Sequence, residues 1–251
     1  SFQTEQEVDD PVHPASSMVG VDLGITRFAT LSDGSYVEPL NAMKKTRKKL
    51  AKAQRDLARK EPFSKNWKKQ KAKVNKIHGH IANARRDYLH KVTTTLCKNH
   101  AVIVLEDLKV KNMSATAKGT VANPGTNVKA KSGLNRSILD QGWYEFRRQV
   151  EYKQQRLGGQ AIIVPPHHTS QKCPECRYVH QGNRRSQATF ECLNCGFKAN
   201  ADWVGSYNIE AKGHFVLACG EQHPLLMEAG TGKLSDRLAP ITGIPHLKHA
   251  V

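Results

Sequence analysis

The sequence predicts a mixed α/β fold: a sheet flanked by helices, with a helical insertion and a small inserted cysteine-rich module. Three observations predict it. Short apolar runs of strand length recur at 18–22, 101–105 and 161–164. A helical stripe of apolar residues lies between the first two runs. Two Cys-x-x-Cys pairs follow the third run. Apolar runs separated by helical segments are typical of strands in an α/β sheet.

The first apolar run opens an expected antiparallel meander. Residues 18–22 read as a buried strand that ends at Asp22. A second strand is expected over 27–31 and a third over 35–38, joined by the turn signal Asp33-Gly34.

Two helices are expected next, as a basic insertion between the first strands and the strand at 101–105. The first covers about 42–59, and the second starts near Ser64. The stripe of the second helix consists of Trp67, Val74, Ile77, Ile81, Ala84, Tyr88, Val92 and Leu96. We expect Trp67 and Trp143 to belong to the core.

The rest of the chain alternates between regular and loose segments. Residues 101–105 read as a parallel strand covered on both faces, ending at Glu106. A mobile loop over 111–133 is expected, followed by one helix over 134–157 that ends at Gly158-Gly159. The remaining expectations are a strand at 161–164, a short helix at 202–211 and a loose tail at 213–251.

Composition points to a polyanionic partner. The 251 residues carry 39 Lys and Arg against 22 acids, a net charge of +17. Nucleic acid is the leading candidate. An anionic membrane is second, but we find no amphipathic helix with bulky apolar anchors. No apolar run is long enough to span a bilayer, and the N-terminus lacks the features of a secretory signal.

Most of the positive charge lies in the helical insertion. Residues 44–76 hold 15 Lys and Arg and two acids. Such a face either contacts phosphates or is solvated. The residues expected to contact nucleic acid are Lys44, Lys45, Arg47, Lys48, Lys49, Lys52, Arg55, Lys68, Lys69, Lys71 and Lys73.

The cysteine pairs predict a structural zinc site. Cys173 and Cys176 are separated from Cys192 and Cys195 by 15 residues, a spacing typical of two zinc knuckles. Four thiolates close a tetrahedral zinc shell, so this metal would do no chemistry. Tyr178-Val179 and 188–191 are expected to form the short strands of this ribbon. Two disulfides or free thiols are the alternative.

Three acids stand where carboxylates can converge. Asp22 and Glu106 each end an apolar strand, and Asp202 opens a helix. If the strands are neighbours, these acids meet at one sheet edge, where hard cations such as Mg²⁺ relieve their repulsion. Each has a structural alternative: Asp22 as a turn cap, Asp202 as a helix N-cap. Asp33 and Asp107 are read as structural.

Five ordered motifs carry a family resemblance. They are GVDLGITRFATLSDG (20–34), VIVLEDL (102–108), HTSQKCPEC (168–176), ECLNCGF (191–197) and NADWVGSYNI (200–209). Together they resemble the C-terminal nuclease half of the TnpB/OrfB proteins, which insertion sequences encode and which are ancestral to type V CRISPR effectors. The resemblance covers about 19–221.

This resemblance implies a RuvC-type (RNase H-like) fold with a helical insertion and a zinc ribbon. It implies an RNA-guided DNA endonuclease with guide RNA and target DNA as partners, in the bacterial or archaeal cytoplasm at the nucleoid. Asp22, Glu106 and Asp202 would be the catalytic acids that hold two Mg²⁺. Water would be the nucleophile, leaving 5′-phosphate and 3′-hydroxyl ends.

The chain departs from the family pattern at three places. Val204 stands where an Asn is usual, and Arg177 follows Cys176 where Gly is common. Only residues 1–18 precede the first motif, where relatives have a wedge barrel and a recognition domain. The expected division is a wedge remnant or linker (1–18), a nuclease domain (19–165 plus 200–212) with its insertion at 41–100, a ribbon (166–199) and a tail (213–251).

Two other functions remain open from the sequence. One is a nucleic-acid-binding protein without cleavage, acting as a guide scaffold or repressor. The other is a transposase of the tyrosine class, for which the pair His167-His168 is the only supporting feature. A zinc ligand role for these histidines is not expected, because four cysteines already complete the shell.

Overall fold

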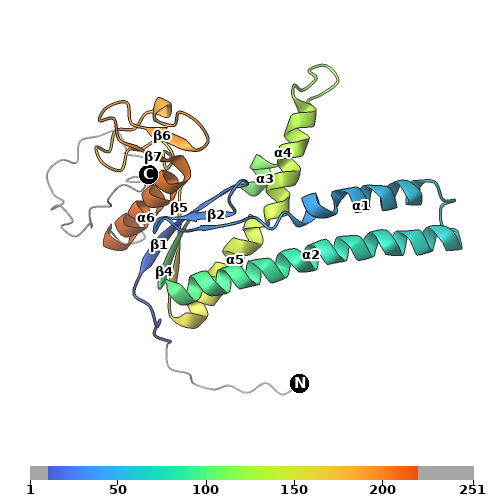
Figure 1. The fold of residues 1–251 in the computed structure, drawn as a ribbon, viewed down its shortest axis with the longest axis horizontal. Coiled ribbons are helices and arrows are strands. Elements are labelled where there is room, and N and C mark those ends of the chain that lie inside the picture. Colours follow the sequence, from blue (N-terminus) through green and yellow to red (C-terminus); the bar gives the residue numbers. More distant parts are fainter. Residues whose placement is uncertain (1–10, 220–251) are drawn as a thin grey trace.

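The computed structural model describes residues 11–219 (Figure 1). Its main sheet consists of β1 (Met18–Leu23), β2 (Ala29–Leu31), β3 (Tyr36–Val37), β4 (Val102–Glu106) and β5 (Gln160–Val164). The helices are α1 (Ala42–Ala58), α2 (Lys65–Asn99), α3 (Val110–Met113), α4 (Val128–Gln141), α5 (Trp143–Leu157) and α6 (Ala201–Cys219). A second, small sheet pairs β6 (Thr189–Glu191) with β7 (Lys198–Asn200).

The main sheet is mixed, as predicted. Its order is β3-β2-β1-β4-β5, with β1 antiparallel to β2 and parallel to β4, and β4 parallel to β5. The expected meander is therefore confirmed, although β2 and β3 are shorter than predicted. The turn at Gly34 has φ of 88°, a conformation that glycine adopts without strain. The strand at β4 lies between two parallel neighbours, which accounts for its unbroken apolar sequence.

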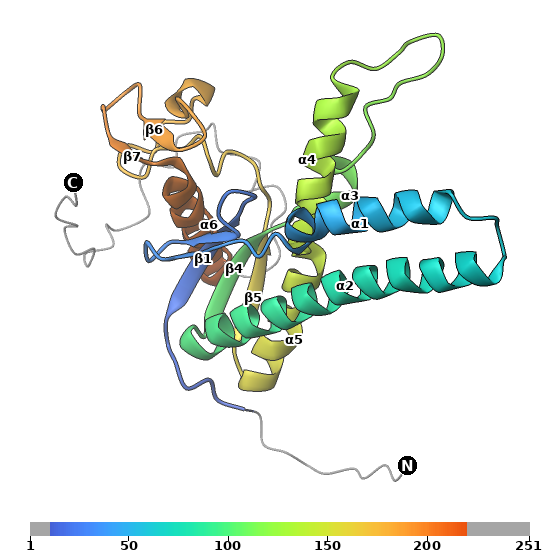
Figure 2. The ribbon, with the colours of Figure 1, turned by 45° about the vertical axis from the view of Figure 1, so that its right-hand side comes forward.

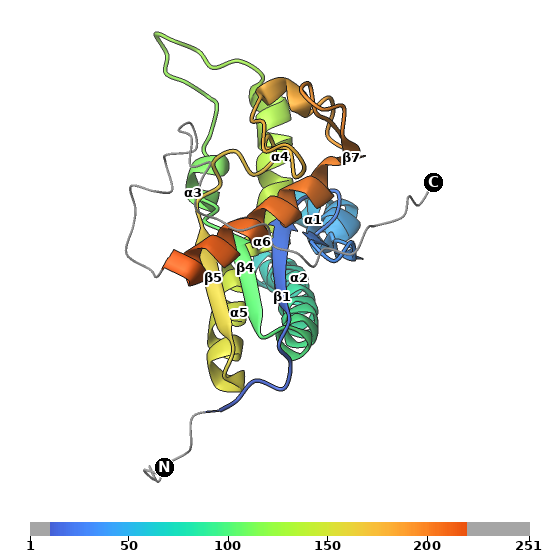
Figure 3. The same cartoon turned by 90° about the vertical axis from the view of Figure 1, so that its left-hand side faces the viewer.

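One face of the sheet is covered by α2 and α5 (Figure 3). Val19 and Val21 of β1 and Ile103 and Leu105 of β4 point to this side, because alternate residues of a strand share a face. They pack against Leu89, Leu96 and Cys97 of α2 and against Phe146 and Val150 of α5. This cluster is the main core.

The opposite face is covered by α6, which crosses the strands (Figure 3). Two glycines permit the close approach. A Cβ at Gly20 of β1 would collide with the α6 backbone at Ser206, and one at Gly213 of α6 would collide with the Val104 side chain. Val104 and Ile209 are fully buried between the two layers. The N-terminal turn of α6 is thereby fixed above the C-terminal ends of β1 and β4.

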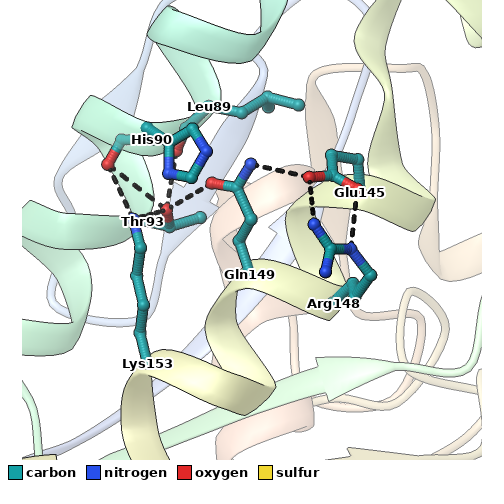
Figure 4. Close-up of polar contacts among 7 residues, drawn as sticks. All are labelled: Leu89, His90, Thr93, Glu145, Arg148, Gln149 and Lys153. Atoms are coloured by element: carbon teal, nitrogen blue, oxygen red, sulfur yellow. Dashed lines mark hydrogen bonds and ion pairs between the residues drawn. The ribbon is translucent and has the colours of Figure 1, made fainter. Parts of the chain in front are cut away.

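A buried polar network joins α2 to α5 (Figure 4). Gln149 is fully buried, and its side chain accepts a hydrogen bond from the Thr93 hydroxyl (3.0 Å) and donates one to Glu145 (2.9 Å). Lys153 donates to the His90 carbonyl and to Thr93. Because buried polar groups are costly when unpaired, this network restricts how α2 lies on α5.

Helices α1 and α2 form a hairpin that projects beyond the sheet (Figures 1 and 2). Asp140 of α4 fixes its base. The buried Asp140 carboxylate accepts hydrogen bonds from the backbone N–H groups of Met43 and Lys44 and pairs with Arg85 of α2 at 2.9 Å. The two predicted helices are confirmed. The prediction that Trp143 is a core residue is also confirmed, but the same prediction for Trp67 is wrong, because Trp67 lies outside the buried clusters.

The segment between β4 and β5 differs from the prediction. The expected loop at 111–133 contains α3 and the first turns of α4. The expected single helix at 134–157 is two helices, broken at Gly142, whose φ is 76°. A Cβ there would come within 3.2 Å of the Leu89 side chain, so glycine lets α2 pass close to the break. Gly158 ends α5 in the left-handed region, as predicted.

The C-terminal part also differs. Tyr178-Val179 contributes one isolated bridge, Lys172–Val179, rather than a strand, and β7 was not predicted. Helix α6 continues to Cys219, so residues 213–219 are helical and not loose. The remainder of the predicted tail and residues 1–10 lie outside the described residues. Within 11–219 we find no helix with the length and apolarity that a bilayer crossing requires.

Candidate functional site

Asp22 and Glu106 are brought together by the register of β1 and β4. Gly20 pairs with Val104 and Val21 with Leu105, so the next step along both strands reaches Asp22 and Glu106. By strand alternation, both carboxylates share the face of Gly20 and Val104, which α6 covers. A Cβ at Gly205 of α6 would lie 3.0 Å from Asp22 Oδ2, so glycine leaves room for this carboxylate.

Asp202 reaches the same place from the first turn of α6. The helix is capped by Asn200, whose side-chain oxygen accepts from the backbone N–H of Asp202 (3.0 Å) and of Trp203 (3.2 Å). The alternative interpretation of Asp202 as an N-cap is therefore wrong. Its carboxylate instead pairs with Arg184 of the cysteine-rich module at 3.2 Å.

The three acids form one electrostatic unit. Burial, followed by the charges of Glu106 and Asp202, raises the pKa of Asp22 from 3.8 to about 8, and Arg184 opposes the shift. Asp22, Glu106 and Asp202 are each half-buried, so solvent still reaches them. Clustered carboxylates that share a partly solvated edge are the donor set that hard divalent cations prefer.

Glu106 is held from the loop that precedes the cysteines. The Thr169 hydroxyl donates to Glu106 Oε1 at 2.5 Å. Burial raises the pKa of Glu106, whereas the Thr169 hydrogen bond and the charges of Lys212 and Arg184 lower it. Thr169 is itself buried, and Asn208 of α6 donates to its carbonyl at 2.7 Å. Glu106 thus has a fixed partner on a fixed loop.

The carboxylates are near one another but are not a single tight ligand cluster. Among the described residues, the only group of three or more His, Cys, Asp or Glu side chains whose ligand atoms all lie within 4.8 Å is the cysteine group. The three acids therefore do not place one oxygen each around a single point. A wider arrangement suits two ions that share the acids, as in two-metal sites with ions about 4 Å apart.

The four cysteines converge as the spacing predicted. Cys173, Cys176, Cys192 and Cys195 place their sulfurs within 4.8 Å of one another, and all four are free thiols. The Cys173–Cys195 and Cys176–Cys192 sulfur separations are 3.6 and 3.5 Å. Zinc–sulfur bonds of about 2.3 Å in a tetrahedron give separations of about 3.8 Å, so these residues fit Zn²⁺.

The two zinc knuckles, residues 173–176 and 192–195, are each followed by a residue in the same backbone conformation. Gly196 follows Cys195 with φ of 75°, and Arg177 follows Cys176 with φ of 61°. Glycine adopts this region freely, but a side chain does so at a cost. The structure therefore places a backbone strain at Arg177 that Gly196 does not carry.

The competing acids have structural roles, as expected. Asp33 accepts from the backbone N–H of Ser35 in the hairpin turn (2.8 Å). Asp107 pairs with Lys109 and with Arg147, the latter at 2.9 Å, and these two partners lower its pKa. Neither carboxylate belongs to the cluster around Asp22.

Sequence reasoning missed four residues that touch the acidic centre or support it: Thr169, Arg184, Asn208 and Lys212. Arg184 is the most consequential, because it brings a positive charge to Asp202 from the cysteine-rich module. Lys212 donates to the carbonyls of Pro165 and His167, which holds the loop that carries Thr169. Two of the four had a signal in the sequence, because Thr169 and Asn208 each lie within one of the family motifs.

Fold and site together define a class of protein: an α/β domain with a carboxylate centre at the sheet edge, a four-cysteine module beside it that could hold a metal ion, and a basic helical arm. Residues 1–117 match the family described as "Probable transposase" (OrfB_IS605), and residues 143–209 match "Cas12f1-like, TNB domain". The chain belongs to the TnpB family.

Individual relatives agree with this assignment. The chain is 62% identical, over 88% of its length, to "Putative RNA-guided DNA endonuclease InsQ" of Escherichia coli K12. It is 33% identical, over 95%, to "Putative RNA-guided DNA endonuclease" of Streptomyces pristinaespiralis. These matches cover 55% and 58% of the relatives, so the chain spans little more than half the length of either.

A solved structure shares the fold. The chain superposes on a Cas12f1–sgRNA–target DNA complex with a TM-score of 0.51 at 17% identity, covering 82% of this chain and 51% of the other. At this level of identity the match concerns the fold alone.

Proposed function

We propose that this chain is the catalytic part of a transposon-associated, RNA-guided DNA endonuclease, with a RuvC-type, RNase H-like fold. The observation that carries the proposal is the convergence of Asp22, Glu106 and Asp202 at one edge of the sheet, from three distant parts of the sequence. The names of the relatives and the Cas12f1 fold support the reaction class and the partners, guide RNA and target DNA.

The acids would hold two Mg²⁺. When bound, the ions lower the pKa of a water molecule and stabilise the leaving oxygen of a phosphodiester. The protein supplies the geometry. The β1–β4 register sets Asp22 beside Glu106, and Thr169 orients Glu106. Asn200 caps α6, so the Asp202 carboxylate is not needed as the helix cap. Arg184 supplies a positive charge next to the site where a phosphate would lie.

The remaining parts would position the nucleic acid. The four cysteines would hold Zn²⁺, which would fix the module that carries Arg184 and the adjoining loop of Thr169. The Lys and Arg side chains of α1 and α2 would contact phosphates, adding affinity without sequence information. In this proposal, residues 19–165 and 200–212 form the nuclease domain, with its insertion at 41–100 and the ribbon at 166–199.

A paired-variant cleavage assay tests the proposal. Single-stranded DNA is incubated with the chain and Mg²⁺, and products are compared for Asp22→Asn, Glu106→Gln and the matched control Asp107→Asn. We expect both site variants to lose cleavage by at least a thousandfold and the control to keep it, because Asp107 pairs with Arg147 outside the cluster. Equal cleavage by the chain and Asp22→Asn would leave only a binding role.

A further inference from the structure

The far end of the α1–α2 hairpin carries two aromatic side chains, Phe63 and Trp67, which we call the aromatic tip. Phe63 is 76% exposed. Its ring centroid lies 5.4 Å from that of Trp67, and Lys71 Nζ lies over the Trp67 ring, 4.9 Å from the ring centroid. Phe is among the residue types most often fully buried, so the exposure of Phe63 is unusual.

Core packing does not account for the aromatic tip. Helix α2 has 35 residues and is therefore about 50 Å long, and its first turn lies at the end remote from the sheet (Figures 1 and 2). Within residues 11–219, neither ring belongs to a buried apolar cluster. Phe63 also has φ of 65°, a region that bulky residues seldom occupy and that often marks functional sites.

A purely local role explains only part of this arrangement. Ser64 is the N-cap of α2, and its hydroxyl accepts a hydrogen bond from the backbone N–H of Trp67 at 3.1 Å. Phe63 precedes this cap, and its contact with the first turn of the helix resembles a hydrophobic staple. A staple stabilises by burying apolar surface, and any large apolar side chain at Phe63 serves it. It does not account for a ring that is three-quarters exposed.

The charges around the aromatic tip identify its partner. Residues 59–73 contain seven Lys or Arg and one acid, Glu61. The cations Lys60, Lys65, Lys68 and Lys69 are exposed on the turn and on the first turns of α2. Aromatic rings set among cations are the recurrent platform for unpaired nucleic-acid bases, because the cations attract phosphates while the bases stack. The apolar area is confined to two rings, which is small for a protein partner.

We propose that the aromatic tip stacks on unpaired bases of the guide RNA. The identity of the partner rests on the proposed function. Bases within a duplex are already stacked on one another, so the tip selects single-stranded segments. The strand being cut must lie at the carboxylates, whereas the tip is at the remote end of α2. A guide that stays bound through turnover is therefore the strand available to it.

The test separates stacking from charge. Binding of a fluorescent 20-nucleotide single-stranded RNA is measured with the Asp22→Asn chain, which removes cleavage from the readout. The variant Phe63→Leu/Trp67→Leu keeps a staple and every cation but has no aromatic ring. The control Phe63→Tyr/Trp67→Tyr keeps two rings. Thermal unfolding shows that each variant folds.

We expect the Leu pair to bind this RNA at least about tenfold more weakly, because stacking contributes strongly for each base. Its salt dependence stays that of the parent, since no phosphate contact is lost. The Tyr pair binds within about threefold, and a duplex RNA binds all variants equally. Unchanged binding by the Leu pair, or an equal loss on duplex RNA, overturns the proposal. So does a loss confined to single-stranded DNA.

The outcome is independent of the cleavage assay. A chain without nuclease activity still shows the stacking effect if the tip binds RNA. Conversely, the chain can cleave single-stranded DNA with full activity and the inference still fails, if the Leu pair binds the RNA as tightly as the parent does.

Discussion

Asp22 and Glu106 occupy neighbouring positions at the carboxyl ends of two adjacent parallel strands, one step beyond the paired residues Val21 and Leu105. This placement makes each carboxylate part of the other's environment. Burial and the charges of Glu106 and Asp202 raise the pKa of Asp22 to about 8. Burial and the neighbouring acids therefore favour the neutral form of Asp22. A cation bound between the acids would favour its charged form instead.

The first prediction concerns Asp22→Asn and pH. Between about pH 4 and pH 8 the folded chain keeps the Asp22 proton that the unfolded chain has released, so the free energy of unfolding falls as pH rises through this window. The Asn variant has no proton to release at this position, so its free energy of unfolding does not fall for this reason. In EDTA, we expect its Tm to exceed that of the parent by roughly 5 °C at pH 8, with the difference vanishing near pH 4.

Mg²⁺ provides the control for this measurement. Because ligand binding to the folded state adds stability, Mg²⁺ should raise the Tm of the parent at pH 8 and leave that of Asp22→Asn nearly unchanged. A Tm difference that is the same at pH 4 and pH 8 would contradict the assigned origin of the shift.

The second prediction concerns Thr169→Val, which keeps the shape of the side chain and removes the donor to Glu106. The Thr169 hydrogen bond lowers the pKa of Glu106, so its loss raises that pKa. Cleavage needs the charged carboxylate, and the acid limb of the pH–rate profile should move to higher pH by about one unit. Thr169→Ser, which keeps the hydroxyl, should retain the parent profile. An acid limb that stays in place for Thr169→Val argues against the role of this contact.

Local patterns were enough to predict the strands of the main sheet and the cysteine site. Apolar runs ending in Asp22 and Glu106 predicted strand ends because a buried strand has a simple two-residue period and a characteristic length. The Cys-x-x-Cys pairs predicted convergence because two short knuckles leave few other arrangements. In each case the chemistry depends on residues that are close in sequence, or on strands that pair edge to edge.

Contacts between distant segments were beyond such patterns. Arg184 sits in a loop without periodicity, and only the docking of the cysteine-rich module brings it to Asp202. The break at Gly142 was missed because the helical stripe continues across it. Trp67 fits the apolar stripe of α2, but it lies in the part of the helix that extends beyond the sheet. The helical period of the stripe therefore does not tell whether Trp67 is buried.

The third prediction concerns zinc. We expect about one zinc per chain by metal analysis, and its loss in Cys192→Ser, because three thiolates no longer close the shell. Cys219→Ser, an exposed cysteine of α6, should keep the metal. Without zinc, the module that carries Arg184 loosens from Asp202, so cleavage should fall at least tenfold even though the three acids are intact. A zinc-free chain with all four thiols free and full activity would contradict this account.

The fourth prediction concerns the unequal knuckles. Arg177 and Gly196 adopt the same left-handed conformation, but only Arg177 carries a Cβ. Replacing Arg177 with glycine removes a conformational cost of about 1 kcal/mol from the folded state, offset in part by the greater freedom of glycine in the unfolded chain. We therefore expect Arg177→Gly to hold zinc more tightly than Arg177→Ala in a chelator competition. The Ala variant is the matched control because it removes the same charge and keeps the strain. If both variants release zinc at the same chelator concentration, the backbone at Arg177 does not carry the proposed strain.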